Sequence, residues 1–142
     1  MSTTTIDVAT LKAWLEADQA LLVDVREPAE NTAKRIAGAT LVPLGAVRAE
    51  AMPALGGRKL VVHCAKGGRG EVARARLQAQ MPGAEIYNLG GGIEAWESAG
   101  QLVLKSTGGA YALDLRVQMA IGVLVLVAVL LGMVIGRGYH FW

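Results

Sequence analysis

The chain has 142 residues, of which 53% are hydrophobic, and it carries 14 basic and 12 acidic side chains for a net charge of +2. This length excludes a (β/α)8 barrel and suits one domain of about 105 residues with a real core. The charges are mixed without a basic stripe, so we expect no nucleic-acid partner. Cys64 is the only cysteine, which excludes an internal disulfide and a Cys-x-x-Cys redox or zinc site.

Hydrophobic spacing and turn residues predict the elements of the first half of the chain. Leu11, Trp14 and Leu15 share one helical face, and a short apolar run follows them, as in a strand buried on both faces. In chain order we predict a helix at 10–20, a strand at 21–25, a polar segment at 26–30, a strand at 39–44 and a short helix at 46–55.

The second half continues the alternation of strands and helices. We predict a strand at 59–63, a tight glycine loop at 67–70, a helix at 71–80, a strand at 85–89 and a short helix that follows the glycines at 90–92 and runs through Trp96. This order indicates the α/β class, with a mainly parallel central sheet flanked by helices. Functional sites in such sheets lie beyond the carboxyl ends of the strands, which singles out the residues after 63.

A very apolar segment stands near the end of the chain. Residues 117–136 comprise 16 hydrophobic residues, three glycines, one glutamine and no charge. As a helix they would span about 30 Å, the thickness of the bilayer hydrocarbon. A linker-like composition begins near residue 101. We predict a domain at 1–105, a linker at 106–116, a transmembrane helix at 117–136 and a short tail at 137–142.

Cys64 stands where a buried strand meets a glycine-rich loop and a helix. Glycines let several backbone N–H groups converge on one point, and such a nest in front of a helix N-terminus attracts anions and favours a thiolate. Lys66 and Arg69 are expected to add positive charge at its rim. We therefore predict a cysteine nucleophile at Cys64, with a substrate cradle made of Ala65, Lys66, Gly67, Gly68, Arg69 and Gly70.

The loop Cys64-Ala65-Lys66-Gly67-Gly68-Arg69 resembles the active-site loop of rhodanese-type sulfurtransferases, Cys-x-x-Gly-x-Arg. Residues 22–30, 36–39 and 91–96 resemble three further signatures of that family, in the family's order. The resemblance implies a rhodanese-like fold and a Cys64 persulfide, formed from thiosulfate or a similar donor. The persulfide sulfur would pass to cyanide or to an external thiol, because the chain has no second cysteine. No cofactor and no metal are implied.

Four positions depart from the family pattern: Gly70 replaces a common serine or threonine, Arg35 a histidine, Ala37 a proline and Asn31 an aromatic residue. We expect these departures to affect substrate preference more than chemistry. Related phosphatases and arsenate reductases use the longer spacing Cys-x5-Arg, so the Cys-x4-Arg spacing favours sulfur over a tetrahedral oxyanion. A membrane-tethered module that binds ligands or senses persulfides without catalysis is the other alternative.

We expect the remaining polar and aromatic residues near the motifs to have structural roles. Asp24 and Arg26 are expected to fix loops by polar contacts, Glu27 and Glu30 to lie on a solvated edge, His63 to pack in its strand and Trp96 to pack in the core. His63 and Cys64 are neighbours on a strand, so their side chains should point to opposite faces and make a poor metal pair.

A rhodanese domain followed by a membrane helix resembles bacterial inner-membrane rhodaneses. With no export signal at the N-terminus, the sulfurtransferase domain is expected to face the cytoplasm. Ala128, Gly132 and Gly136 recur at four-residue spacing within the predicted span. Small residues on one helix face support association in lipid, so this face is a candidate homodimer contact, with the bilayer itself as a further partner.

Overall fold

Five parallel strands form the central sheet of the computed structural model, which describes residues 4–106. Their order is β1-β6-β5-β2-β4. The bounds are β1 Thr5–Ile6, β2 Ala20–Asp24, β4 Thr40–Leu41, β5 Lys59–His63 and β6 Ile86–Leu89. The two longest strands, β2 and β5, pair from Ala20 opposite Lys59 to Asp24 opposite His63. The predicted α/β class with a mainly parallel sheet is confirmed.

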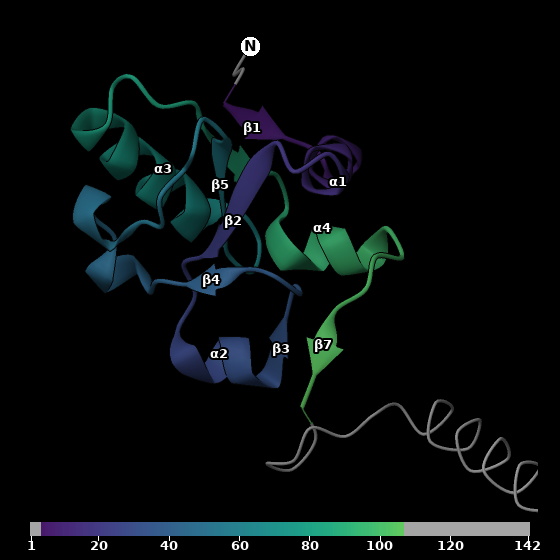
Figure 1. Cartoon of the computed structure of the whole chain (residues 1–142). Helices are drawn as coiled ribbons and strands as arrows, with labels where there is room; N and C mark the ends of the chain where they lie inside the picture. The colour runs from purple at the N-terminus through teal and green to yellow at the C-terminus, as the bar shows by residue number, and fades with distance from the viewer. Residues whose placement is uncertain (1–3, 107–142) are drawn as a thin grey trace, which may run out of the picture. The chain divides into compact units, whose positions relative to one another are not determined.

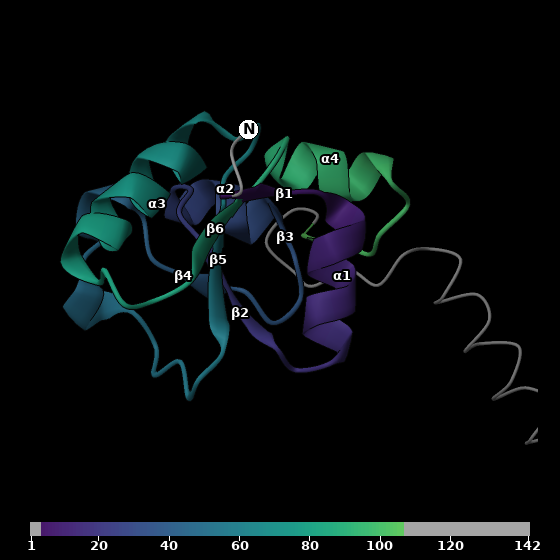
Figure 2. The same ribbon diagram turned by 90° about the horizontal axis from the view of Figure 1, so that it is seen from above.

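Helices cover both faces of this sheet (Figures 1 and 2). Helix α3, Gly68–Gln80, lies on one face, where its Ala73 and Leu77 pack in a core cluster that also contains Cys64. Helices α1, Val8–Glu16, and α4, Gly92–Ser98, lie on the other face. They contribute Leu11, Ile93 and Trp96 to a second core cluster. The successive residues of β5 alternate between these two clusters, as strand geometry requires.

A small unit of α2, Pro28–Ala33, β3, Lys34–Arg35, and β7, Leu104–Lys105, joins the end of the domain to its first half. Strands β3 and β7 pair antiparallel, and Ser106 N–H donates to the Ala33 carbonyl at 3.0 Å. The linker-like stretch after residue 101 is therefore packed on the domain as far as Ser106. Nearby, the indole of Trp96 donates to the Leu102 carbonyl at 3.0 Å, so the predicted core role of Trp96 is confirmed.

Several predicted elements differ from the structure. The strand expected at 39–44 is shorter and comprises Thr40–Leu41. The helix expected at 46–55 is wrong: two short 3-10 turns, Leu44–Ala46 and Ala49–Ala51, occupy this region, where Val47 is the one buried side chain between 46 and 55. The first helix begins at Val8, because Asp7 accepts the Thr10 N–H, and it ends at Glu16. The polar segment at 26–30 continues into α2.

No helix within residues 4–106 is both long enough and apolar enough to cross a bilayer. The span predicted at 117–136 lies outside the described residues, as do the tail and the small-residue face of Ala128, Gly132 and Gly136.

Candidate active site

Cys64 lies directly after β5, the middle strand, where the carboxyl ends of the parallel strands meet. Its side chain is buried, and its Sγ accepts a hydrogen bond from Gly67 N–H at 3.0 Å. Gly67 has a φ of +116° and caps α3, which begins at Gly68. The predicted loop at 67–70 is thus shorter than expected, because Gly68, Arg69 and Gly70 form the first turn of α3. The sulfur lies at a helix N-terminus, where the peptide dipoles favour negative charge.

The N-terminus of α4 holds the two carbonyls of the loop. Ile93 N–H donates to the Cys64 carbonyl at 2.9 Å, and Glu94 N–H donates to the Ala65 carbonyl at 3.1 Å. A trans peptide directs its N–H opposite to its carbonyl, so the N–H groups of Ala65 and Lys66 point away from α4. The carbonyl oxygens of Cys64 and Ala65, which would repel an anion, therefore face α4 and accept its N–H groups.

Gly92 permits this close approach of α4. A Cβ on this residue would lie 2.6 Å from the Ala65 carbonyl oxygen, and its φ is +58°. Both the space and the backbone conformation therefore require glycine. The glycines at 90–92 connect β6 to α4, as the sequence predicts. The structure shows that Gly92 must be glycine because α4 approaches the Cys64 loop so closely.

Asn88 is a residue that the sequence reasoning did not single out. It lies in β6 opposite Val62 of β5, is buried, and donates from Nδ2 to the Gly67 carbonyl at 3.0 Å. Its Oδ1 is close to Gly70, where a Cβ would collide with it. The Asn88 side chain thus occupies the space that a Cβ would need at Gly70, where the family often has serine or threonine. A polar side chain in an otherwise apolar strand is the signal that could have identified Asn88.

The two cations expected at the rim differ in their surroundings. Arg69 donates to both carboxylate oxygens of Glu30, at 2.6 and 2.8 Å. This hydrogen bonding from Arg69 lowers the pKa of Glu30 to about 2 and raises the pKa of the guanidinium. Glu30 is 35% exposed, as expected for an edge, but α2 places its carboxylate against Arg69 of α3, a pairing that the sequence did not predict. Lys66 is exposed and has no ion-pair partner among the residues from 4 to 106.

A buried ion pair between Asp24 and Arg26 supports the loops around the site. Arg26 donates to Asp24 from Nη2 at 2.8 Å and Nε at 3.0 Å, and it also donates to the Lys34 carbonyl at 2.6 Å. Asn31 adds a further bond to Asp24 at 3.0 Å. Burial opposes ionisation of Asp24, but these hydrogen bonds outweigh it and lower the pKa of its carboxyl. The predicted role of Asp24 and Arg26 in fixing loops is confirmed.

His63 is buried between this ion pair and the cysteine. Its Nδ1 lies 3.3 Å from the Cys64 carbonyl, and its Nε2 lies 4.0 Å from Asp24 Oδ1. Burial lowers the pKa of the imidazole, which keeps the ring neutral. The ring therefore packs within the domain, and no group of three or more metal-ligating side chains surrounds it in the described part of the chain.

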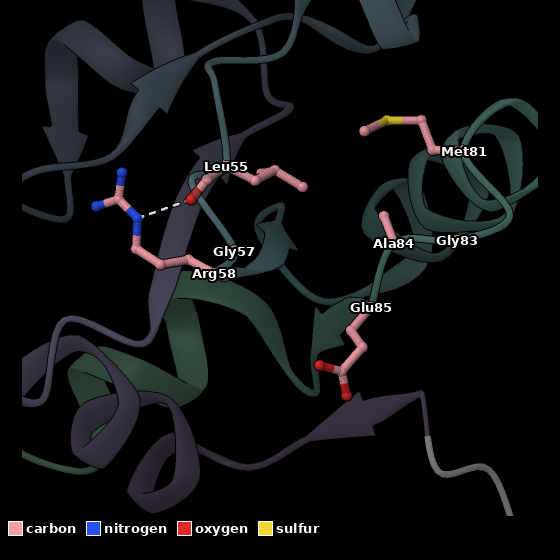
Figure 3. Close-up of a pocket in the computed structure, with 7 residues that line it drawn as sticks. All are labelled: Leu55, Gly57, Arg58, Met81, Gly83, Ala84 and Glu85. Carbon is pink, nitrogen blue, oxygen red and sulfur yellow. Dashed lines mark hydrogen bonds between the residues drawn. The ribbon is translucent and has the colours of Figure 1, made fainter.

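A separate cavity of about 390 Å³ opens at the other end of the sheet (Figure 3). Arg58 on its wall directly precedes β5, and Glu85 directly precedes β6, whereas Cys64 follows β5. The cavity therefore lies at the amino ends of the strands, away from the sulfur. Its lining residues are Leu55, Gly57, Arg58, Met81, Gly83, Ala84 and Glu85.

Comparison with known proteins identifies similar sequences over the region of these motifs. Residues 7–99 match the family model of the Rhodanese-like domain. A protein named sulfurtransferase from Allochromatium vinosum is 32% identical over 93 residues, which cover 66% of this chain and 86% of that protein. An uncharacterized protein of Synechocystis sp. is 34% identical over 138 residues, or 96% of this chain and 76% of that protein.

Solved structures share the fold. The Rhodanese-like domain of an Anabaena protein is 25% identical, with a TM-score of 0.64 over 80% of this chain and 89% of that chain. A rhodanese-related protein from Thermoplasma volcanium is 28% identical, with a TM-score of 0.60 over 70% of this chain and 95% of that chain. Thiosulfate sulfurtransferase from Pseudomonas aeruginosa, at 24% identity, a TM-score of 0.63 and coverage of 79% and 22%, has the same fold. These likenesses confirm the fold that the four motifs predict.

Proposed function

The chain belongs to the rhodanese-like domain family, and on this premise we propose that it is a sulfurtransferase whose Cys64 carries a sulfane sulfur as a persulfide. The observation that carries the proposal is the Gly67 N–H on Cys64 Sγ at the N-terminus of α3. A backbone donor and aligned helix dipoles stabilise negative charge on sulfur, including the charge of a persulfide. The name of the Allochromatium vinosum relative supports the same chemistry.

The proposed reaction with thiosulfate has two displacement steps on sulfur. The Cys64 thiolate attacks the outer sulfur of thiosulfate, the sulfur–sulfur bond of the donor breaks, and sulfite leaves with the bonding electron pair. Cyanide or an external thiolate then attacks the terminal sulfur of the persulfide. The Cys64 thiolate departs unchanged, and thiocyanate or a new persulfide is released. Neither step requires an oxidant, a metal or a cofactor.

Lys66 is the residue that we assign to recognition of an anionic donor. Its ammonium group is exposed on the loop that carries Cys64, and no carboxylate of residues 4–106 neutralises it. A local positive potential raises the concentration of small anions near the sulfur. Ala65 and the glycines from Gly67 to Gly70 would contribute backbone to the cradle. Arg69 would shape it through Glu30.

We further propose that residues 117–136 anchor this domain in the bacterial inner membrane, with the sulfurtransferase domain in the cytoplasm. The support is the sequence itself: twenty residues without a charge, flanked by Arg116 and Arg137. Gly132, with Ala128 and Gly136 on the same helical face, would be a contact for a second copy of the chain.

Intact-mass measurement tests the sulfurtransferase proposal directly. Incubation with thiosulfate should add the mass of one sulfur atom, and cyanide should remove it. The Cys64→Ser variant should show neither change, because serine cannot form the persulfide. Sulfur transfer that persists in Cys64→Ser would refute the proposal. Absence of the adduct in a folded wild-type protein would favour the binding module, and hydrolysis of an aryl phosphate would favour a phosphatase.

A further inference from the structure

We propose that Asn88 is a positioning residue for Cys64, because its amide holds the Gly67 carbonyl and thereby keeps the Gly67 N–H on the sulfur. The inference rests on the proposed function only for the reaction that Cys64 performs. The structural part concerns how the Gly67 N–H is held on the sulfur, which can be tested without any sulfur donor.

The Gly67 carbonyl is held by two donors from different parts of the fold. One is Glu71 N–H at 3.1 Å, which is the first helical bond of α3, and the other is Asn88 Nδ2 at 3.0 Å. Asn88 is 4% exposed and stands in β6, which pairs with the strand that ends at Cys64. A rigid strand thus fixes the orientation of the peptide that follows Gly67.

This orientation matters because Gly67 adopts a conformation that needs support. Its φ is +116°, far from the helical values of the residues that follow it. Glycine has many accessible conformations, so its N–H keeps its direction only when both flanking peptides are held. The preceding N–H is the one that contacts Cys64 Sγ at 3.0 Å. Loss of the Asn88 bond would leave the Gly67 carbonyl held by Glu71 N–H alone, without a link to β6, and allow the N–H on the sulfur to turn away.

The amide oxygen of Asn88 gives a second reason to assign this residue a positioning role. Its Oδ1 is buried and has no hydrogen-bond partner within the described residues. An unsatisfied buried acceptor is unfavourable, and an apolar side chain of similar size would avoid that cost. The same oxygen also lies where a Cβ at Gly70 would be. The bond from Nδ2 to the Gly67 carbonyl is the one hydrogen bond that the Asn88 side chain makes within residues 4–106.

The test is the pH dependence of Cys64 alkylation by iodoacetamide in the full chain, followed by intact mass. Cys64 is the only cysteine, so the readout is specific. Asn88→Leu removes the donor and keeps the branching and the number of side-chain heavy atoms. The bond from Gly67 N–H to the sulfur weakens when the Asn88 bond is lost, so alkylation at pH 7 should slow about tenfold and the profile should move to higher pH.

Ile86→Val is the matched control. Ile86 is buried in the same strand, but it has no hydrogen bond to the loop, so its truncation perturbs the core without touching Gly67. Its alkylation profile should equal that of the wild type. Asn88→Ser, whose hydroxyl is too short to replace the amide at the Gly67 carbonyl, repeats the test if Asn88→Leu does not fold.

The two proposals fail in different ways. A folded Asn88→Leu or Asn88→Ser protein with the wild-type alkylation profile would overturn the role of Asn88, and so would a wild-type cysteine that does not react with iodoacetamide at pH 8. A shifted profile in a protein that forms no persulfide from thiosulfate would support Asn88 and overturn sulfur transfer.

Discussion

Arg69 binds Glu30 through both of its terminal nitrogens, at 2.6 and 2.8 Å, and so joins the first turn of α3 to α2. The motif arginine is therefore neutralised by a carboxylate 39 positions earlier in the chain. Lys66 has no such partner in residues 4–106, although it lies in the same loop as Cys64. Lys66→Ala and Arg69→Ala should therefore affect sulfur transfer differently, although both cations belong to the same motif.

Lys66→Ala should weaken the use of an anionic donor and spare a neutral one. Removal of one exposed charge is expected to lower kcat/KM for thiosulfate about threefold at low salt, and the difference should shrink at high salt because exposed charges are screened. Steady-state kinetics with thiosulfate and with a neutral organic persulfide would measure this. Equal losses with both donors would show that Lys66 shapes the loop and does not attract the anion.

Arg69→Ala should instead reduce activity with both donors to a similar degree. Its removal leaves Glu30 without its partner and releases α2 from the first turn of α3, so the geometry of the cradle changes for every substrate. The same two kinetic assays apply, and Arg74→Ala is a suitable control because Arg74 pairs with Glu71 on α3. A loss confined to thiosulfate would mean that Arg69 meets the donor directly.

The Glu30–Arg69 pair also predicts how stability depends on pH. The pKa of Glu30 is lowered by Arg69 from 4.5 to about 2. The folded state therefore binds the proton less well than the unfolded state, so the pair stabilises the fold fully above pH 4.5. This contribution is lost as pH falls from 4.5 towards 2. Thermal unfolding of wild type and Glu30→Gln should differ at pH 7, and that difference should narrow below pH 4.5. A constant difference across this range would contradict the assigned pKa.

The strands that build the site could be predicted closely from sequence. Strand β5 has the predicted bounds and β2 differs by one residue at each end, because a continuous apolar run between turns is a strong signal for a strand buried on both faces. Helix α2 gives no such signal, since none of its residues is buried. Its capping box between Glu27 and Glu30, with Pro28 at the first position, is the local sequence signal for this helix.

The parts of the site that were missed depend on contacts between distant segments. The contact of Gly67 N–H with Cys64 Sγ is local, so the glycines and the following helix indicate it. The contact between Asn88 and Gly67 joins residues 21 positions apart, and Glu30 and Arg69 are 39 apart. Neither pair has a sequence pattern of its own. They arise from the order of strands, which brings β6 and α2 to the edge where Cys64 lies.

Gly92→Ala should destabilise the domain more than Gly100→Ala. Both glycines have positive φ, +58° and +80°, so both substitutions carry the conformational cost of a left-handed residue, about 1 kcal/mol. A Cβ at Gly100 meets nothing within 4 Å, whereas one at Gly92 collides with the backbone of the loop at Ala65. We expect a total loss of about 3 kcal/mol for Gly92→Ala. Chemical denaturation measures the difference, and equal losses would mean that α4 does not approach the loop closely.

The same pair of variants should separate stability from activity. Under conditions where both proteins are folded, Gly100→Ala should form the Cys64 persulfide at the wild-type rate. Gly92→Ala should form it more slowly, because displacement of α4 releases the carbonyls of Cys64 and Ala65. Normal persulfide formation in folded Gly92→Ala would show that these two hydrogen bonds contribute to folding alone.

Removal of residues 107–142 should separate membrane attachment from chemistry. The contacts of β7 with β3 and the Ser106 bond to Ala33 are complete at residue 106, so a fragment of residues 1–106 keeps every described element. We expect the full chain to sediment with membranes and to remain there after alkaline carbonate extraction, and the fragment to stay in the supernatant with the same persulfide formation per Cys64. A shorter fragment of residues 1–102 lacks β7 and leaves β3 unpaired, so it should unfold at a lower temperature than the 1–106 fragment.

Release of the full chain by carbonate would refute the proposed anchor. A folded 1–106 fragment that forms no persulfide, beside an active full chain, would show that the segment after 106 takes part in the reaction.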